Sequence, residues 1–305
     1  MSTEPENTGP AYLPADTLPR KPRVALMGEF SAGKSTLANL MIGTDPLPMQ
    51  VVATQLPPVW ISHGQTETVI VDLEGDETPC DLNTVRDLVP DDVAYIRFKC
   101  TEEILQMCDI IDMPGISDPN MSSNVWERIL PAADAVIWCS PSTQAWRQSE
   151  AAVWEGVAPH LHQNSMLLLT RADMLLTDRD RNKVLRRVQN ETDGFFSHVQ
   201  LISLLQARDA DEDAELLERS GADAFVQVFL ELLDRLNTEI NGSDHAYATV
   251  HPRPADQQTA PAGEENAAEN KVVPRRPVAK TSQRNAAPKG EPAPLDPAEF
   301  TPKFS

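Results

Sequence analysis

The stretch GEFSAGKST, residues 28–36, decides the fold of this chain. It follows the apolar run VALM, residues 24–27, and it leads into the helical pattern LANL, residues 37–40. Its letters fit G-x-x-x-x-G-K-[ST], the loop in which successive backbone N–H groups and a helix N-terminus wrap the phosphates of a nucleotide. The order of strand, glycine loop and helix therefore predicts a nucleotide-binding site at this place in the chain.

Two side chains of this loop have separate expected roles. The Lys34 ammonium would reach the β and γ phosphates, and the Ser35 hydroxyl would bind Mg²⁺. We expect the whole loop to lie against the nucleotide, that is, Gly28, Glu29, Phe30, Ser31, Ala32, Gly33, Lys34, Ser35 and Thr36.

The composition of the chain limits its class. With 26 Lys and Arg against 46 Asp and Glu over 305 residues, the net charge is −20, which argues against binding to nucleic acid. The acidic first residues do not resemble a secretory signal, and no apolar run approaches the length of a membrane-spanning helix. The cysteines have neither C-x-x-C pairs nor metal-like spacing, which favours reduced thiols of a cytoplasmic protein: Cys80, Cys100, Cys108 and Cys139.

The hydrophobic pattern divides the chain into three parts. Residues 1–21 are polar and contain several prolines, which predicts a disordered leader. Residues 22–242 hold nearly all of the hydrophobic pattern and form the expected domain. Residues 243–305 are rich in Pro and Ala and predict a disordered tail. The tail carries a basic block that is either a solvated linker or a weak contact with anionic lipid or an acidic partner: Lys271, Arg275, Arg276, Lys280, Arg284 and Lys289.

Apolar runs alternate with helical patterns through the central part. The expected strands are residues 24–27, 69–73, 93–98, 110–111, 135–139, 166–169 and 199–202, and the expected helices are residues 34–42, 124–130, 148–160, 182–192 and 222–240. Such alternation requires crossover connections. We therefore expect an α/β fold with a doubly wound, mostly parallel sheet and helices on both faces. The apolar face of the last helix either packs on its own sheet or docks on a partner.

A second motif, DMPG, follows an apolar strand. Asp112 at the strand end would hold Mg²⁺ through water, and the Gly115 N–H would contact the γ phosphate, so that hydrolysis releases the following loop. The stretch VIVDLEG offers an alternative, Asp72, in a D-x-x-G pattern after a better strand. We prefer Asp112 because its spacing from Asp173 fits the basic plan of GTP-binding domains, and because Pro114 favours a turn.

The stretch MLLLTRADML carries the pattern [NT]-[KR]-x-D. Asp173 would accept hydrogen bonds from the ring N–H and the exocyclic amine of guanine, whereas adenine has no such pair of donors. Thr170 and Arg171 complete the motif, with Arg171 laid over the base. Ser203 and Leu204, at a later strand end, are expected in a further loop that contacts the base. The expected nucleotide is therefore GTP; an ATP-using enzyme would require that Asp173 has no role.

A switch threonine is expected between the two phosphate motifs. Thr54, within LPMQVVATQLPP, is our choice to bind Mg²⁺ and to present its backbone to the attacking water. Thr44 lies nearer to the first helix and comes too early.

Taken together, GEFSAGKSTL, LPMQVVATQLPP, DIIDMPGISD, ADAVIW and TRAD resemble the GTPase domain of bacterial dynamin-like proteins, over roughly residues 22–240. The resemblance implies a Ras-like sheet, binding of GTP and Mg²⁺, hydrolysis stimulated when two GTPase domains pair as a homodimer, and work at the periphery of a membrane. K⁺ is a further cation to test. The resemblance implies catalytic roles for Ser31, Lys34, Thr54 and Gly115, and metal-binding roles for Ser35, Thr54 and Asp112.

This sequence also departs from the family's pattern. Phe30 stands where the eukaryotic branch has a glutamine thought to act in catalysis, and Ile116 stands where a glutamine would orient water. Arg171 replaces the usual lysine. We therefore expect slow hydrolysis by the chain alone. We also expect no helical stalk after residue 242, which raises the idea of a separate helical partner protein. The alternative function is a nucleotide-gated binding module with negligible hydrolysis.

Overall fold

The structure is a computed structural model that describes residues 10–14, 16–43, 56–81, 85, 88–118, 121–210 and 213–242. Contacts divide the chain into two units, Met1–His251 and Pro252–Ser305, and every described residue belongs to the first. The predicted tail with its basic block, and residues 1–9 of the predicted leader, lie outside the described residues. The domain boundaries at residues 22 and 242 therefore stay predictions.

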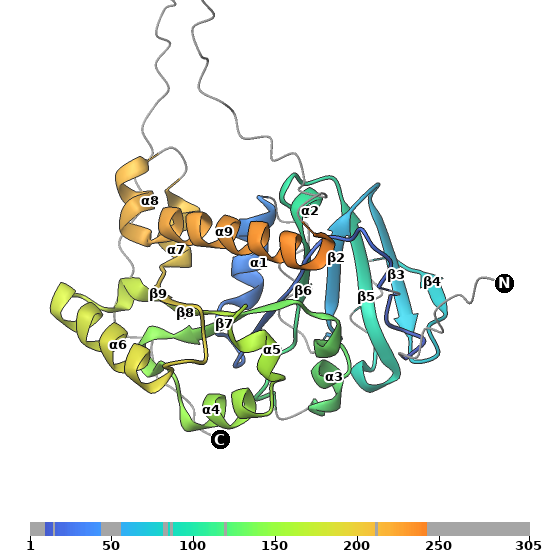
Figure 1. The fold of residues 1–305 in the computed structure, drawn as a ribbon, viewed down its shortest axis with the longest axis horizontal. Coiled ribbons are helices and arrows are strands. Elements are labelled where there is room, and N and C mark those ends of the chain that lie inside the picture. Colours follow the sequence, from blue (N-terminus) through green and yellow to red (C-terminus); the bar gives the residue numbers. More distant parts are fainter. Residues whose placement is uncertain are drawn as a thin grey trace, which may run out of the picture. The chain divides into compact units, whose positions relative to one another are not determined.

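Within the described ranges, nine strands form one sheet in the order β4-β3-β5-β2-β6-β1-β7-β8-β9 (Figure 1). The strands are β1 (Arg23–Gly28), β2 (Val59–His63), β3 (Glu67–Asp72), β4 (Glu77–Pro79), β5 (Val93–Cys100), β6 (Asp109–Asp112), β7 (Ala135–Pro141), β8 (Met166–Thr170) and β9 (His198–Leu201). β6, β1, β7, β8 and β9 run parallel to one another. β2 and β5 are parallel to each other and antiparallel to β6, and the outer pair β3 and β4 is antiparallel. The predicted α/β fold with a mostly parallel sheet is confirmed.

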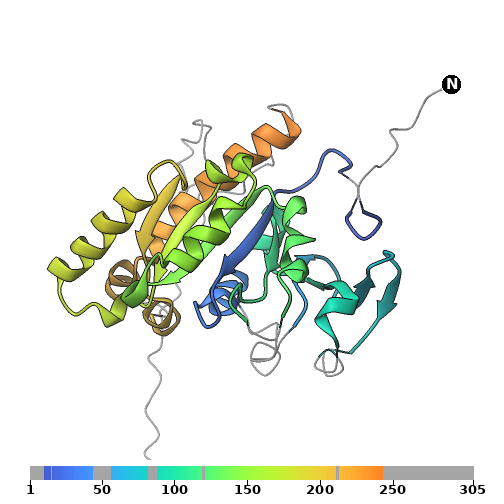
Figure 2. The ribbon, with the colours of Figure 1, turned by 90° about the horizontal axis from the view of Figure 1, so that it is seen from below.

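Helices pack on both faces of this sheet, as Figures 1 and 2 show. They are α1 (Lys34–Ile42), α2 (Ile104–Met107), α3 (Asn124–Glu127), α4 (Gln148–Glu155), α5 (Pro159–His162), α6 (Asp178–Glu191), α7 (Leu204–Asp209), α8 (Ala214–Ser220) and α9 (Ala222–Asn241). The described residues also form short 3₁₀ turns: η2 (Pro90–Asp92), η3 (Leu130–Ala132), η4 (Ser142–Gln144) and η5 (Ala172–Met174).

The alternation of side chains along β1 explains the two layers. Val24 and Leu26 belong to one apolar cluster, which includes side chains of α1, α2, α7 and α9. Ala25 and Met27 belong to the other cluster, which includes side chains of α3, α4, α5 and α6. Because successive side chains of a strand point to opposite faces, a central strand covered on both sides is apolar throughout. This is why β1, β7 and β8 are continuous apolar runs in the sequence.

Several elements differ from the expected pattern. β4, α2, α7 and α8 are not among the expected elements, and the helix expected over residues 124–130 ends at Glu127. β2 was not expected, because the stretch VWISH has only three apolar residues, yet it pairs with both β5 and β6. The expected helix over residues 148–160 is divided into α4 and α5, since Gly156 ends α4 and Pro159 begins α5. The helix expected from residue 182 begins at Asp178, because the Thr177 side chain accepts a hydrogen bond from the Asp180 N–H and caps it.

α9 packs on its own sheet. Phe225, Phe229 and Leu236 are buried in the first apolar cluster, and Leu232 and Leu233 lie beside them. The spacing of these residues places them on one side of a helix, as the sequence predicts. The choice between packing and docking left open by the sequence is therefore settled for this face of the helix.

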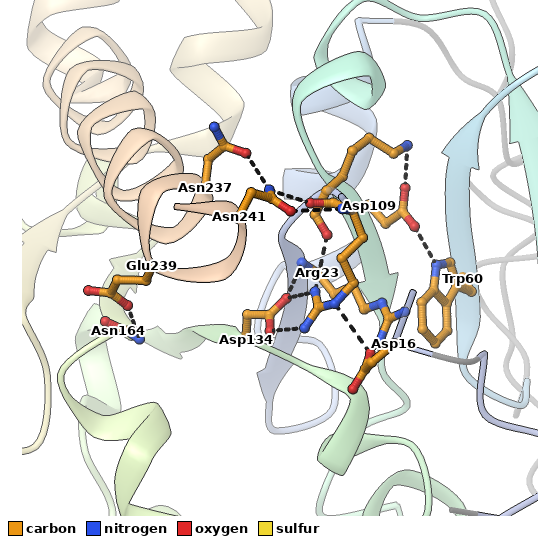
Figure 3. A network of polar contacts seen from close by, with 11 residues as sticks. Asp16, Arg23, Trp60, Asp109, Asp134, Asn164, Asn237, Glu239 and Asn241 are labelled. Atoms are coloured by element: carbon orange, nitrogen blue, oxygen red, sulfur yellow. Dashed lines mark hydrogen bonds and ion pairs between the residues drawn. The ribbon is translucent and has the colours of Figure 1, made fainter. Parts of the chain in front are cut away.

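The segment before β1 is fixed to the start of the sheet and to the end of α9 (Figure 3). The Arg20 guanidinium donates to both carboxylate oxygens of Asp134, at 2.6 and 2.8 Å. The Arg20 N–H donates to the Asn241 side chain at 2.9 Å, and the Asn241 amide donates back to the Arg20 carbonyl at 2.8 Å. Lys21 pairs with Asp109. The composition predicts a disordered leader up to residue 21, but Arg20 and Lys21 are held because both cations meet carboxylates at the starts of β6 and β7.

Candidate nucleotide-binding site

The phosphate loop connects the end of β1 to the start of α1, and its glycines are required by its shape. Gly28 has φ +137°, and a Cβ atom there would lie 2.1 Å from the Cys139 carbonyl oxygen of β7. Gly33 has φ +98° and is the N-cap of α1. A side chain at either position would be strained, so the first and last glycines of the motif follow from backbone geometry.

Lys34 is buried in the loop. Its ammonium donates to the carbonyl oxygens of Gly28, at 3.1 Å, and Glu29, at 2.9 Å. A lysine ammonium has three N–H donors, so one remains for a phosphate oxygen. Burial lowers the pKa of Lys34, whereas the negative charge of Asp112 raises it. The loop therefore holds its cation in place before any phosphate arrives.

Ser35 and Asp112 form the polar pair that fits a metal ion. The Ser35 hydroxyl donates to Asp112 Oδ2 at 2.7 Å, and Asp112 Oδ1 is buried without a hydrogen-bond partner among the described residues. Burial raises the pKa of Asp112, although the Ser35 hydrogen bond and the Lys34 charge lower it. A hydroxyl and a carboxylate with a spare oxygen are the hard ligands that Mg²⁺ prefers. These residues fit the metal that a bound nucleoside triphosphate would bring.

The loop after Asp112 packs against the phosphate loop. A Cβ atom at Gly115 would lie 2.9 Å from the backbone of Phe30, so only glycine allows this approach. The Ile116 N–H donates to the Gly28 carbonyl at 3.2 Å. The structure thus brings the DMPG motif and the glycine loop together.

The alternative acid, Asp72, lies elsewhere in the fold. It ends β3, which β5, β2 and β6 separate from β1. Its carboxylate accepts the N–H groups of Glu74, at 3.0 Å, and Asp76, at 2.8 Å, within the turn between β3 and β4. Asp72 is therefore occupied as a turn cap, which supports the choice of Asp112.

The predicted base-binding residues converge at the ends of β8 and β9. The Ser203 hydroxyl caps α7 and donates to Asp173 Oδ1 at 2.6 Å. Leu204 is buried, and its side chain lies 3.0 Å from where a Cβ atom of Gly33 would be. The Asp173 carboxylate is therefore held in a fixed orientation beside the loop that the sequence predicts as its neighbour.

Thr170 and Arg171 connect this base-binding region to the phosphate loop. The buried Thr170 hydroxyl donates to the Ala32 carbonyl at 2.8 Å. Arg171 has φ +55°, and its guanidinium donates to the Ser31 carbonyl at 2.6 Å. In this structure both side chains hold the phosphate loop. Their contacts with the base, expected from the motif, stay predictions.

Thr54, the predicted switch threonine, and the alternative Thr44 lie outside the described residues. Of the remaining predicted loop residues, Ala32 is buried, whereas Phe30 is 61% exposed. Other large apolar side chains are exposed near the same site: Met174 beside Asp173, Leu176 just after it, and Leu205 beside Leu204.

Sequence reasoning missed one group of residues at this site. Arg147, the N-cap of α4, and Ser149, in the first turn of α4, bind the carboxylate of Glu29 at 2.6 and 2.7 Å. Nothing in the sequence around residue 147 points to the phosphate loop. The only local signal is the Glu150 side chain at the start of a helix, which accepts the Arg147 N–H as in a capping box.

The fold and the site together define the class of this domain. A parallel sheet carries a glycine loop with its lysine at the end of β1, an aspartate beside the loop serine at the end of β6, and a T-R-A-D motif at the end of β8. These are the parts of a P-loop GTPase.

Comparison with known proteins finds a similarity to one family. The model of the Dynamin family matches residues 24–172, which include both phosphate motifs and most of the base motif. Dynamin-like protein 2 of Campylobacter jejuni subsp. jejuni serotype O:23/36 (strain 81-176) is 23% identical over 230 residues, 73% of this chain and 36% of that protein. The part of the chain that carries both phosphate motifs is therefore similar to the Dynamin family.

A solved structure shares the fold. It is described as an oligomerised bacterial dynamin pair, and it matches 72% of this chain and 36% of its own chain with a TM-score of 0.51 and 17% identity. At this identity the likeness concerns the fold alone. The present chain therefore spans little more than a third of the length of these relatives. Among the described residues, no helix is long and apolar enough to cross a membrane.

Proposed function

We propose that this chain binds GTP with Mg²⁺ and hydrolyses it to GDP and phosphate. The observation that carries the proposal is the Ser35–Asp112 pair, whose spare carboxylate oxygen lies buried beside the lysine of a glycine loop. When bound, Mg²⁺ would offset the negative charge of the phosphates. The family of the domain supports the same reaction.

The residue roles follow from the geometry. The remaining N–H of Lys34 would bind a β or γ phosphate oxygen, and the Gly115 N–H would contact the γ phosphate. Ser35 and Asp112 would hold the metal, together with Thr54. The carboxylate of Asp173, oriented by Ser203, would accept the two N–H donors of guanine.

We expect slow hydrolysis by the monomer and faster hydrolysis after pairing. Phe30 and Ile116 occupy the positions where a glutamine would help the attacking water, and neither side chain can bind water. Phe30, Met174 and Leu205 are exposed apolar groups near the site, and Leu176 is 91% exposed. Such exposed groups favour burial against a second copy. The solved relative is described as an oligomerised pair, which also supports pairing.

A second candidate is a nucleotide-gated binding module with negligible hydrolysis. The exposed Phe30 favours it, because an exposed apolar group at the phosphate loop can bind a partner but cannot orient the attacking water. In that case the bound nucleotide would control a partner, such as a separate helical protein.

We also propose that the protein acts in the cytoplasm, at the periphery of a membrane. The related structure is described as a pair that senses and tethers membranes, and the four described cysteines are free thiols. The basic block of the tail is the proposed contact with anionic lipid.

Hydrolysis of GTP and of ATP should be compared over a wide range of protein concentration, with Mg²⁺ present and with K⁺ or Na⁺ as the monovalent ion. GTP-specific turnover that rises per molecule with concentration would support a GTPase activated by pairing. Tight GTP binding with flat, near-zero turnover would favour the binding module. Equal use of ATP would contradict the assigned role of Asp173.

A further inference from the structure

Glu29 has one set of partners for its backbone carbonyl and another for its carboxylate, and the nucleotide-binding motifs do not explain the second set. Its backbone carbonyl accepts from the Lys34 ammonium at 2.9 Å and from the Ala32 N–H at 3.2 Å. Its carboxylate accepts from Arg147 Nη1 at 2.6 Å and from the Ser149 hydroxyl at 2.7 Å. Glu29 is therefore held by its backbone to Lys34 and by its side chain to the N-cap and the first turn of α4.

The loop before α4 is itself firmly fixed. The buried Glu150 carboxylate accepts from the Trp138 indole and the Ser140 hydroxyl of β7, and from the Arg147 N–H, each at 2.9 Å. The Trp146 N–H in turn donates to the Ser140 hydroxyl at 3.1 Å. Arg147 therefore extends from a loop that is attached to the sheet, so it can hold Glu29 in one position.

The charges show why that position matters. Glu29 is buried near Lys34, and its negative charge acts on the lysine. It also lies close enough to Glu150 for the two carboxylates to repel each other. Arg147 is the cation that neutralises the Glu29 carboxylate. Without it, a buried carboxylate would be left with one neutral donor, and its charge would act on the lysine that has to face the phosphates.

We propose that Arg147, assisted by Ser149, is a positioning residue: by binding Glu29 it keeps the Glu29 carboxylate away from Lys34 and leaves the lysine for the β and γ phosphates. The inference rests on the proposed binding of GTP, and it adds a residue outside the nucleotide motifs to that site. The inference also gives Glu29, the acid after the first glycine, a role: the Glu29 charge holds the loop in place only while Arg147 is present.

The test is a set of nucleotide affinities measured by titration calorimetry with Mg²⁺ for the full chain, Arg147→Ala, Glu29→Gln and the double variant. Arg147→Ala should lower the affinity for GTP and for GDP about tenfold, which is the effect of losing one charge-assisted interaction. The affinity for GMP should not change, because GMP has no β phosphate. Glu29→Gln should restore most of this loss in the double variant, because the uncompensated carboxylate is gone. A merely structural role would give no rescue.

Arg97→Ala is the matched control, because Arg97 also pairs with a glutamate, Glu77, but lies on β5 away from the loop. It should bind GTP as the unchanged chain does. Arg147→Lys, which keeps the charge, should retain most of the affinity, and circular dichroism of each variant shows whether it is folded.

Three results would overturn the inference. Arg147→Ala could bind GTP normally, or the double variant could bind GTP as weakly as Arg147→Ala does. The affinity of Arg147→Ala for GMP could also fall as much as its affinity for GTP. In each case the unchanged chain still binds GTP, so the proposed function would stand. Failure of the unchanged chain to bind GTP would refute the proposed function, and the positioning role with it.

Discussion

At the scale of single residues, we expect the orientation of Asp173 to determine which base the proposed site accepts. Its carboxylate receives the Ser203 hydroxyl at 2.6 Å, which leaves the second oxygen and the remaining lone pairs for a ligand. A base needs two donors on one edge to pair with the free positions of the Asp173 carboxylate. Guanine presents such an edge, and a partly buried carboxylate that a bound base covers without pairing it is costly.

Asp173→Asn should therefore lower the affinity for GTP by about a hundredfold and raise the relative affinity for xanthosine triphosphate. The new amide N–H would face the N–H groups of guanine, whereas xanthine offers a carbonyl oxygen at the position of the guanine amine. Competition of the two nucleotides for a fluorescent GDP analogue measures this shift. Asp178→Asn, at the exposed start of α6, is the matched control. An unchanged preference in Asp173→Asn would remove Asp173 from the base site.

The raised pKa of Asp112 predicts a pH dependence of metal binding. Burial favours the protonated carboxyl, and only the carboxylate binds Mg²⁺, so Mg²⁺-dependent GTP affinity should fall with decreasing pH from a higher pH than an ordinary aspartate would give. For the same reason the ionised group destabilises the metal-free fold as pH rises above the pKa of an unfolded aspartate. Titrations of GTP with and without Mg²⁺ across the acidic range measure the first effect.

Asp112→Asn separates the two effects. It removes the buried charge but keeps an oxygen for the Ser35 hydroxyl, so the metal-free protein should unfold at the same or a higher temperature near neutral pH. Mg²⁺ should no longer strengthen GTP binding. A variant that keeps its Mg²⁺ response would place the metal on other residues.

Sequence motifs indicate those residues whose roles come from local backbone shape. Gly28 and Gly33 are glycines because of close contacts and positive φ, and such constraints are visible as letters of a motif. Arg147 could not be found in this way. Its partner Glu29 lies 118 residues away, and their contact exists only because β7 lies beside β1 in the sheet.

At the scale of elements, α9 is the helix whose single apolar face fastens it to the sheet. Phe225 and Phe229 stack with ring centroids 5.6 Å apart. Apolar residues recur every three or four positions through this part of the sequence. This is why the helix could be predicted almost to the residue.

Phe229→Ala should destabilise the domain by about 3–5 kcal/mol, because the ring is 3% exposed and the cavity it leaves cannot close fully. Urea denaturation followed by circular dichroism measures the change. Val226→Ala on the same helix is the control, since Val226 is 50% exposed and its truncation should cost less than about 0.5 kcal/mol. Equal losses in the two variants would mean that the packed face of α9 is misassigned.

Elements whose stability comes from neighbours were harder to predict than α9. β2 has a weak pattern and exists because β5 and β6 supply hydrogen bonds on both of its sides. α2, α7 and α8 are at most seven residues long, too short for a helical period to stand out in the sequence. Their positions follow from packing on longer elements.

At the scale of the whole described domain, the Arg20 contacts join the segment before β1 to the last turn of α9. Arg20→Ala should destabilise the domain by about 1–3 kcal/mol, because Asp134 would lose a paired, largely buried cation. Hydrogen exchange should also become faster in the last turn of α9, next to Asn241. Arg179→Ala, on the exposed side of α6, should change neither quantity. Unchanged exchange at α9 in Arg20→Ala would mean that the Asn241 hydrogen bonds hold without the ion pair.

These Arg20–Asn241 hydrogen bonds place the residues just before β1 and the last turn of α9 side by side. Two chain positions that touch can be joined by a very short linker, and new termini can then be opened in a surface turn, such as the one between β3 and β4. Such a circular permutant should keep the sheet order and the nucleotide site. The same closeness would allow the domain to be inserted into a loop of an unrelated protein, because the two ends of that loop would need to move apart very little.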